Sequence, residues 1–325
     1  MSDHISVPRP SFIQRLTYIV LLILLMAGVF YVGVDDEDEG AQVVSQIQFA
    51  QGTFVPYSPG SLQSGYAPLS YYIQGYAMLL VGPSLFVSRA VSAIMAAFGV
   101  FLAMRLVQRV AGYWASIVLL LLLLATPQTL RIYSTGFGYG LTSAYLVAAL
   151  WAVCSIQRPR LRVFVALLCA GTTVLIRHSL IATPIVFLLY FALTEKPGDW
   201  VPAALGAALI GAGAVIPFWP YIAAIANSIP FMGRFLPWSP PPELLFANFG
   251  GRSTLSIDNL YDLHIAVSTH QAVFILCGLG LVLYVVSRWN RFSSRESFSE
   301  AHIAIIACVV FAANMLVNWL SSVFL

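Results

Sequence analysis

Long apolar runs recur from one end of this 325-residue chain to the other, and they constrain its fold more than any other feature. A run of about 20 apolar residues is long enough to cross the hydrocarbon core of a bilayer as a helix. The runs are continuous and do not alternate as barrel strands do, so helices are predicted. About nine spans are expected, at residues 12–34, 84–109, 113–130, 137–156, 161–177, 179–194, 200–222, 268–287 and 301–324.

The composition agrees with a membrane protein and excludes several other classes. Hydrophobic residues make up 59% of the chain and charged residues 9%, which leaves no water-exposed face for a soluble core. We therefore expect an all-α polytopic membrane helix bundle that forms one integral-membrane domain over residues 1–325. The net charge of +3 is small and its basic residues are scattered, so no nucleic-acid partner is indicated. The cysteines have neither CxxC nor zinc-site spacing.

The basic residues predict the orientation of these spans. Most of them fall at the end that holds the N-terminus, which the positive-inside rule makes cytoplasmic. The first span has no Ala-x-Ala cleavage site, so it is expected to remain as a helix. We predict a multi-pass protein of a bacterial inner membrane, with its N-terminus in the cytoplasm. The basic residues at that end are Arg9, Arg15, Arg105, Arg109, Arg158, Arg160, Arg162, Lys196, Arg288, Arg291 and Arg295.

Two long loops then face the periplasm, at residues 35–83 and 223–269. Within the first loop, Val43, Val44, Ile47 and Ala50 recur at helical spacing with glutamines between them, which suits a helix lying in the membrane interface. A second interfacial helix is predicted to start after Pro68, with tyrosines as anchors. The anchors are Tyr71, Tyr72 and Tyr76. Long loops on a membrane scaffold usually carry function.

Five acids in a row follow the first span directly, from Asp35 to Glu39, in a chain that is nearly free of charge. Crowded carboxylates repel one another, so their presence at a membrane surface needs a reason. One of them could act as a general base. The alternative is a solvated acidic loop that helps to fix the topology. Carboxylate oxygens also suit a divalent cation, although no metal site and no cofactor are predicted.

The sequence around these acids resembles the first outer loop of the C-superfamily (GT-C) glycosyltransferases. The likeness is strongest to the protein mannosyltransferase and lipid A aminoarabinose transferase branch. It covers residues 12–155, and beyond them only the hydropathy pattern is similar. The motifs that carry it are Asp38-Glu39-Gly40, Gly52, Pro56-Tyr57, Tyr66-Ala67-Pro68-Leu69-Ser70-Tyr71-Tyr72, Gly82-Pro83-Ser84 and Ser88-Arg89-Ala90-Val91-Ser92-Ala93.

The resemblance implies transfer of a sugar from a polyprenyl-phosphate-linked donor to a lipid, glycan or protein acceptor at the outer face of the membrane. Asp38 is then the candidate base and Glu39 its partner, while Asp36 with Glu37 forms an alternative register. The departing phosphate needs cations nearby. The candidates are Arg177 and His178 after the fifth span and Arg131 after the third.

Each of these cations also has a non-catalytic interpretation, as an interfacial side chain that reaches to lipid headgroups. Arg89 is not counted as catalytic. We expect it to pack at the head of the second span, with the acid loop as one possible neighbour. A groove wide enough for an isoprenoid chain is expected between the first outer loop and the fifth and sixth spans.

Two other functions stay open at this point. A transporter or channel would use the acids as a cation-attracting vestibule, although its spans would then usually carry charges near their middle, and these do not. A non-catalytic glycosyltransferase-like subunit that works with a partner is the other alternative. It is kept open because many members of the resembled family carry an acid near residues 133–139, and this chain has none there.

Overall fold

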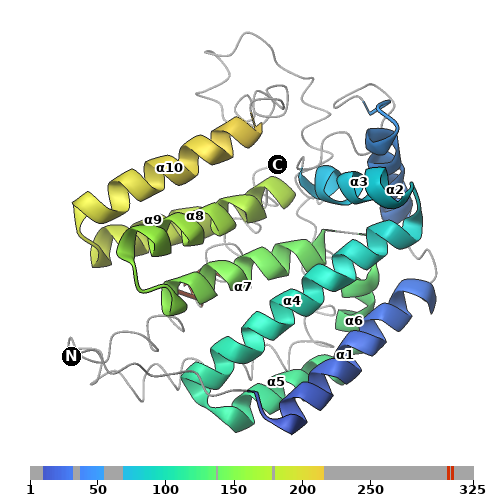
Figure 1. The fold of residues 1–325 in the computed structure, drawn as a ribbon, viewed down its shortest axis with the longest axis horizontal. Helices are drawn as coiled ribbons and strands as arrows, with labels where there is room; N and C mark the ends of the chain where they lie inside the picture. Colours follow the sequence, from blue (N-terminus) through green and yellow to red (C-terminus); the bar gives the residue numbers. More distant parts are fainter. Residues whose placement is uncertain are drawn as a thin grey trace, which may run out of the picture.

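The computed structural model describes residues 10–31, 37–54, 69–136, 138–177, 180–215, 306–307 and 309–310. Regular structure in these ranges is helical throughout, which confirms the all-α prediction for the part described. The helices are α1 (Phe12–Tyr31), α2 (Glu37–Ala50), α3 (Leu69–Val81), α4 (Leu85–Ala111), α5 (Tyr113–Leu124), α6 (Pro127–Ser134), α7 (Tyr139–Ser155), α8 (Pro159–Ile176), α9 (Ala182–Thr194) and α10 (Pro197–Val215) (Figure 1).

Several predictions concern other parts of the chain. The loop 223–269 and the span 268–287 lie outside the described residues, as does most of the span 301–324. Short helical pieces at residues 306–307 and 309–310 belong to that last span, and Ile306 and Val310 are buried against the bundle.

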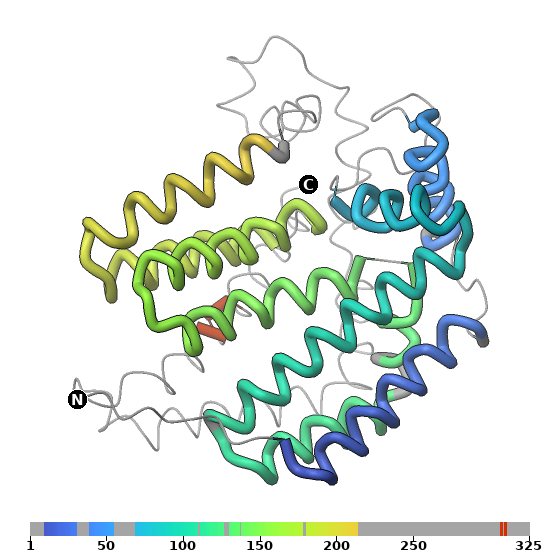
Figure 2. The backbone as a smooth tube through the Cα atoms, viewed as in Figure 1, coloured from blue at the N-terminus to red at the C-terminus, as the bar shows by residue number. Residues whose placement is uncertain are grey.

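The long helices lie side by side and slanted, so that the chain passes back and forth between two ends of a bundle (Figure 1). We call the end that carries α2 and α3 the α2 end, and the opposite end, where α4 meets α5, the basic end. α4 packs on α7, α7 on α8, and α8 on α10, while α1 packs on α4 and α6. α4 and α7 run in the same direction because α5 and α6 return the chain between them (Figure 2).

The predicted span 113–130 is wrong in one respect, because it is divided into α5 and α6. Pro127 is the first residue of α6 and has no N–H to continue α5. The residue before a proline is also pushed out of the helical region, and Thr126 has φ −109° and ψ 87°. The break is therefore set by this one residue and its neighbour.

Among the residues that the structure describes, three helical segments are long and apolar enough to cross a membrane, namely Phe12–Phe30, Leu85–Arg109 and Pro159–Ile176. Large apolar side chains also cover the outside of the bundle, with Leu80 88% exposed and Leu193 86% exposed. Soluble proteins rarely expose so many large apolar side chains. The fold therefore supports a membrane protein, as predicted.

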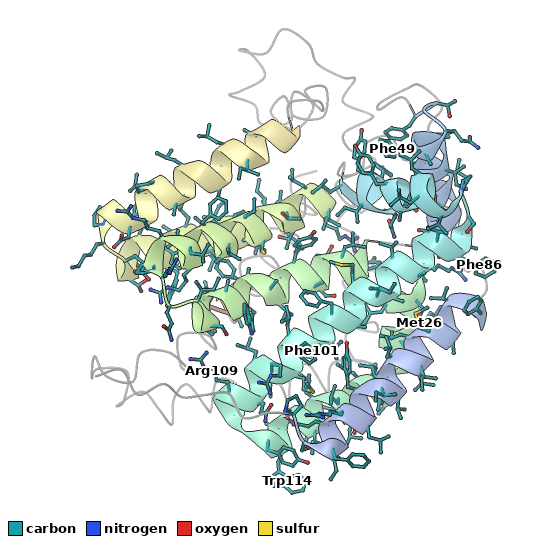
Figure 3. The ribbon with its side chains drawn as sticks, in the orientation of Figure 1. Met26, Phe49, Phe86, Phe101, Arg109 and Trp114 are labelled. Atoms are coloured by element: carbon teal, nitrogen blue, oxygen red, sulfur yellow. The ribbon has the colours of Figure 1, made fainter. Side chains whose placement is uncertain are left out.

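Basic side chains divide unequally between the two ends. Arg160 pairs with Asp199 across α8 and α10 at 3.1 Å, and Arg162 pairs with Glu195. Arg109 reaches from the last turn of α4 to the carbonyl of Cys154 on α7 at 2.6 Å (Figure 3). Among the described residues, the basic end holds Arg15, Arg105, Arg109, Arg158, Arg160, Arg162 and Lys196, whereas Arg89, Arg131 and Arg177 lie toward the α2 end.

The parallel pair α4 and α7 is held together by very close backbone contact. A Cβ added at Gly140 would lie 2.2 Å from the carbonyl oxygen of Ser92, and one added at Gly99 would lie 2.9 Å from the Cα of Ala144. Small residues let helices in lipid approach closely enough for dispersion forces to hold them. The α4–α7 contact therefore depends on glycine at these positions.

We expect Gly140→Ala to destabilise the protein, because α4 and α7 would have to separate to admit the new methyl group. Forcing extra atoms into a packed interface typically costs about 1–3 kcal/mol. Gly213→Ala is the matched control, since a Cβ there meets nothing within 4 Å. Thermal unfolding in detergent micelles measures both. Equal melting temperatures for the two variants would contradict the proposed close contact.

Candidate functional site

The acid run leads directly into α2. This helix starts at Glu37, so Glu37, Asp38 and Glu39 occupy its first turn, where carboxylates are stabilised by the free N–H groups and the helix dipole. The helix predicted from the spacing of Val43, Val44, Ile47 and Ala50 is thus confirmed, and it begins at Glu37. Asp36 lies outside the described residues, and of Asp38 the structure describes the backbone, which is part of α2.

Glu39 is buried, with 1% of its side chain exposed, and forms an ion pair with Arg89, of which 2% is exposed. Arg89 donates from Nε to Glu39 Oε1 at 2.8 Å and from Nη2 to Glu39 Oε2 at 2.7 Å. The backbone N–H of Gly136 donates to the same Oε1 at 2.6 Å. Two-point pairing of this kind fixes orientation as well as charge. The expectation that Arg89 packs against the acid loop at the head of α4 is confirmed.

The face of α2 that meets the protein is mostly polar, with one buried apolar residue, Val43. Gln42, Ser45 and Gln46 are buried together with Glu39, whereas Val44 is 50% exposed. Glu39, Gln42 and Gln46 are three and four residues apart, so they share one side of the helix. The glutamines that stand between the apolar residues of this helix, Gln42 and Gln46, are therefore among the residues that attach α2 to the bundle. Their spacing from Glu39 was the sequence signal that could have identified them.

Gly136, in the loop between α6 and α7, is bonded by side chains from three helices. Its carbonyl accepts from Gln74 Nε2 of α3 at 3.0 Å, from Gln46 Nε2 of α2 at 3.3 Å and from Ser88 Oγ of α4 at 3.4 Å. Gln46 Nε2 also donates to Gln74 Oε1 at 2.6 Å. Because its N–H is bonded to Glu39, both backbone groups of Gly136 are satisfied by side chains. Gln74 was not predicted from the sequence, and Ser88 was noted only as part of the motif of residues 88–93.

Arg177 lies at the same end of the bundle. It caps α8, and its guanidinium lies 4.1 Å from the centroid of the Tyr139 ring, at the start of α7. This cation–π contact fixes the side chain without neutralising its charge. Arg131 lies in the last turn of α6 and is exposed, and His178 lies outside the described residues. Within the described ranges, no group of three His, Cys, Asp or Glu residues is placed to hold a metal ion.

An aromatic cluster joins α2 to α3. The Phe49 ring, labelled in Figure 3, packs edge-to-face against Tyr72 and Tyr76, with ring centroids 4.3 and 5.1 Å away. Tyr76 is 59% exposed and fits the expected interfacial anchor, but Tyr71 is buried. Burial, and the neighbouring Tyr76, raise the pKa of Tyr72 to about 12, so this phenol stays protonated near neutral pH.

An apolar groove of about 610 Å³ opens between α8, α9 and α10. The groove lies beside the fifth and sixth predicted spans, as expected, but its third wall is α10, and Leu69, the first residue of α3, is among the described residues its one lining residue from the first outer loop. Leu175 and Ile181 belong to its wall and lie on either side of Arg177 along the chain. The groove therefore reaches toward the α2 end, where the cation lies.

The buried ion pair makes a specific prediction about stability. Arg89→Met leaves the Glu39 carboxylate buried without a counter-charge, and breaking a buried pair in this way typically costs about 3–5 kcal/mol. The double variant Glu39→Gln, Arg89→Met buries no charge, so it should unfold at a higher temperature than Arg89→Met alone. Thermal melting in detergent is the measurement. A double variant less stable than either single variant would contradict this account.

No family model, no curated protein and no solved structure matches this chain. The likeness to the C-superfamily therefore stays a prediction from the motifs of residues 12–155. A helical membrane bundle serves many kinds of chemistry, so the fold alone does not identify an activity. The function has to be argued from the residues that meet at the α2 end.

Proposed function

We propose that this chain is an integral-membrane glycosyltransferase of the C-superfamily type. It transfers a sugar from a polyprenyl-phosphate-linked donor to a lipid, glycan or protein acceptor at the outer face of a bacterial inner membrane. One observation carries the proposal: an apolar groove, a cation and an acid-bearing helix all reach the same end of the bundle. That combination matches a donor with a long apolar tail, an anionic phosphate and a reacting sugar.

The groove suits the tail of such a donor. Its lining is almost entirely apolar, and its volume of about 610 Å³ lies within the range of small-molecule sites. The phosphate would then lie beside Arg177. Along the chain, Arg177 falls between the groove residues Leu175 and Ile181. A guanidinium can bind phosphate through two parallel N–H groups. His178 and Arg131 are the further candidates for the donor phosphate.

The acid run supplies the base. Asp38 lies in the first turn of α2, next to Glu39, which the ion pair with Arg89 holds in place. In the proposed reaction Asp38 takes the proton from the acceptor hydroxyl, and the hydroxyl oxygen bonds to the anomeric carbon. The bond from that carbon to the phosphate oxygen breaks, and the lipid phosphate leaves with its electron pair. A single in-line displacement inverts the anomeric centre.

Asp38→Asn tests the base. Transfer of label from radioactive polyprenyl-phosphate sugars should fall by roughly 10²–10⁴-fold, because a general base contributes about that much. The melting temperature should hardly change. Asp35→Asn removes one charge from the same run and serves as the control. Loss of transfer in Asp36→Asn but not in Asp38→Asn would establish the alternative register instead.

Arg177→Gln tests the phosphate-binding cation. We expect KM for the donor to rise by roughly tenfold to a hundredfold, because a hydrogen bond to a charged group contributes about 1.5–3 kcal/mol. Arg177→Lys, which keeps the charge but not the two-point geometry, should lie between wild type and Arg177→Gln. Arg160→Gln at the basic end is the control. An unchanged KM in Arg177→Gln would remove Arg177 from the donor site.

A further inference from the structure

We propose that Glu39 and Arg89 are positioning residues for the transfer reaction. They hold the loop between α6 and α7 against α2, and so set how the turn that carries Asp38 lies relative to Arg177. This inference rests on the proposed function, because it concerns the same site. It is supported by the hydrogen bonds to Gly136 and by the contacts of Gly138 and Tyr139 with the end of α8 and Arg177.

The first step is the attachment of the loop to α2. Glu39 Oε1 accepts from the N–H of Gly136 at 2.6 Å, and the carbonyl of Gly136 accepts from Gln46, two turns further along α2. A Cβ at residue 136 would lie 2.7 Å from Ser88 Oγ and 2.8 Å from Val43 Cγ2, so a larger residue here would force these side chains to move. The loop is therefore fixed to α2 at one residue, through both of its backbone groups.

The second step leads from the loop to Arg177. Gly138 lies so close to the end of α8 that a Cβ there would be 2.8 Å from Ile176 Cγ2. The guanidinium of Arg177 lies over the ring of the next residue, Tyr139, at 4.1 Å from the ring centroid. Contacts thus connect α2 to Gly136, and further contacts connect Gly138 and Tyr139, at the end of the same short loop, to the end of α8 and Arg177. A displacement of the loop would move Arg177 relative to α2.

The third step is the chemistry of Glu39 itself. Its two oxygens accept three hydrogen bonds, from Arg89 Nε, Arg89 Nη2 and Gly136 N, and the side chain is 1% exposed. A carboxylate in this state is poorly placed to take a proton from an incoming acceptor. Asp38, one residue earlier in the same turn, is left as the base. Glu39 acts through Gly136 and Arg89 instead.

The test compares the double variant Glu39→Gln, Arg89→Met with wild type by two measurements. Hydrogen–deuterium exchange of the segment 135–139 should become at least tenfold faster, because the N–H of Gly136 loses its charged acceptor. The kcat for sugar transfer should fall at least tenfold, while the acid limb of its pH profile stays where it is in wild type. Arg162→Met, Glu195→Gln removes the matched ion pair at the basic end. This control should change neither measurement.

The possible failures can be told apart. An unchanged kcat, even with faster exchange, would overturn the positioning role and leave the proposed function standing. Disappearance of the acid limb would make Glu39 the base and would also overturn it. Unchanged exchange would show that Glu39 does not hold the loop. Absence of transfer in the wild-type protein would overturn the proposed function and this inference together. Melting temperatures measured alongside separate these effects from general unfolding.

Discussion

The ion pair between Glu39 and Arg89 is the interaction on which the α2 end of this molecule depends. Two opposite charges that are almost fully buried are stable only when each is paired and hydrogen-bonded, since their desolvation is costly. Glu39 meets this condition by accepting from Nε and Nη2 of Arg89 and from the N–H of Gly136. Because these donors come from α4 and from the loop after α6, satisfying one carboxylate fixes three separate segments.

The uncharged polar groups around this ion pair are also hydrogen-bonded. Gln46, Gln74 and Ser88 satisfy the carbonyl of Gly136, which would otherwise be a bare polar group near lipid. The polar face of α2 turns inward and Val44 turns outward. This arrangement is expected where the solvent is hydrocarbon, because apolar side chains lose nothing by facing it and polar groups find partners only inside the protein.

Away from this end, the bundle is held by packing. One buried cluster joins α1, α4, α5 and α6, and another joins α7 to α10 with Ile306 and Val310. The close approach of Ser92 to Gly140 connects the two halves through the parallel pair α4 and α7. The groove lies in the second half and the acid-bearing helix lies over the first. A reaction between groups from both halves therefore requires the loop at Gly136 to be placed accurately.

The sequence by itself determined the helical class, the positions of most helices and the two helices of the first loop, because apolar periodicity and prolines act over a few residues. It also predicted Arg89 near the acid loop and a groove beside the fifth and sixth spans. The partners of Glu39, the inward turn of the glutamines and the contact of Arg177 with Tyr139 were decided by the tertiary structure. Gly136 lies 97 residues from Glu39, and no local pattern says which backbone N–H a carboxylate will meet across such a separation. The division of the span 113–130 has a local cause instead, because Pro127 ends one helix and begins the next within an otherwise continuous apolar run.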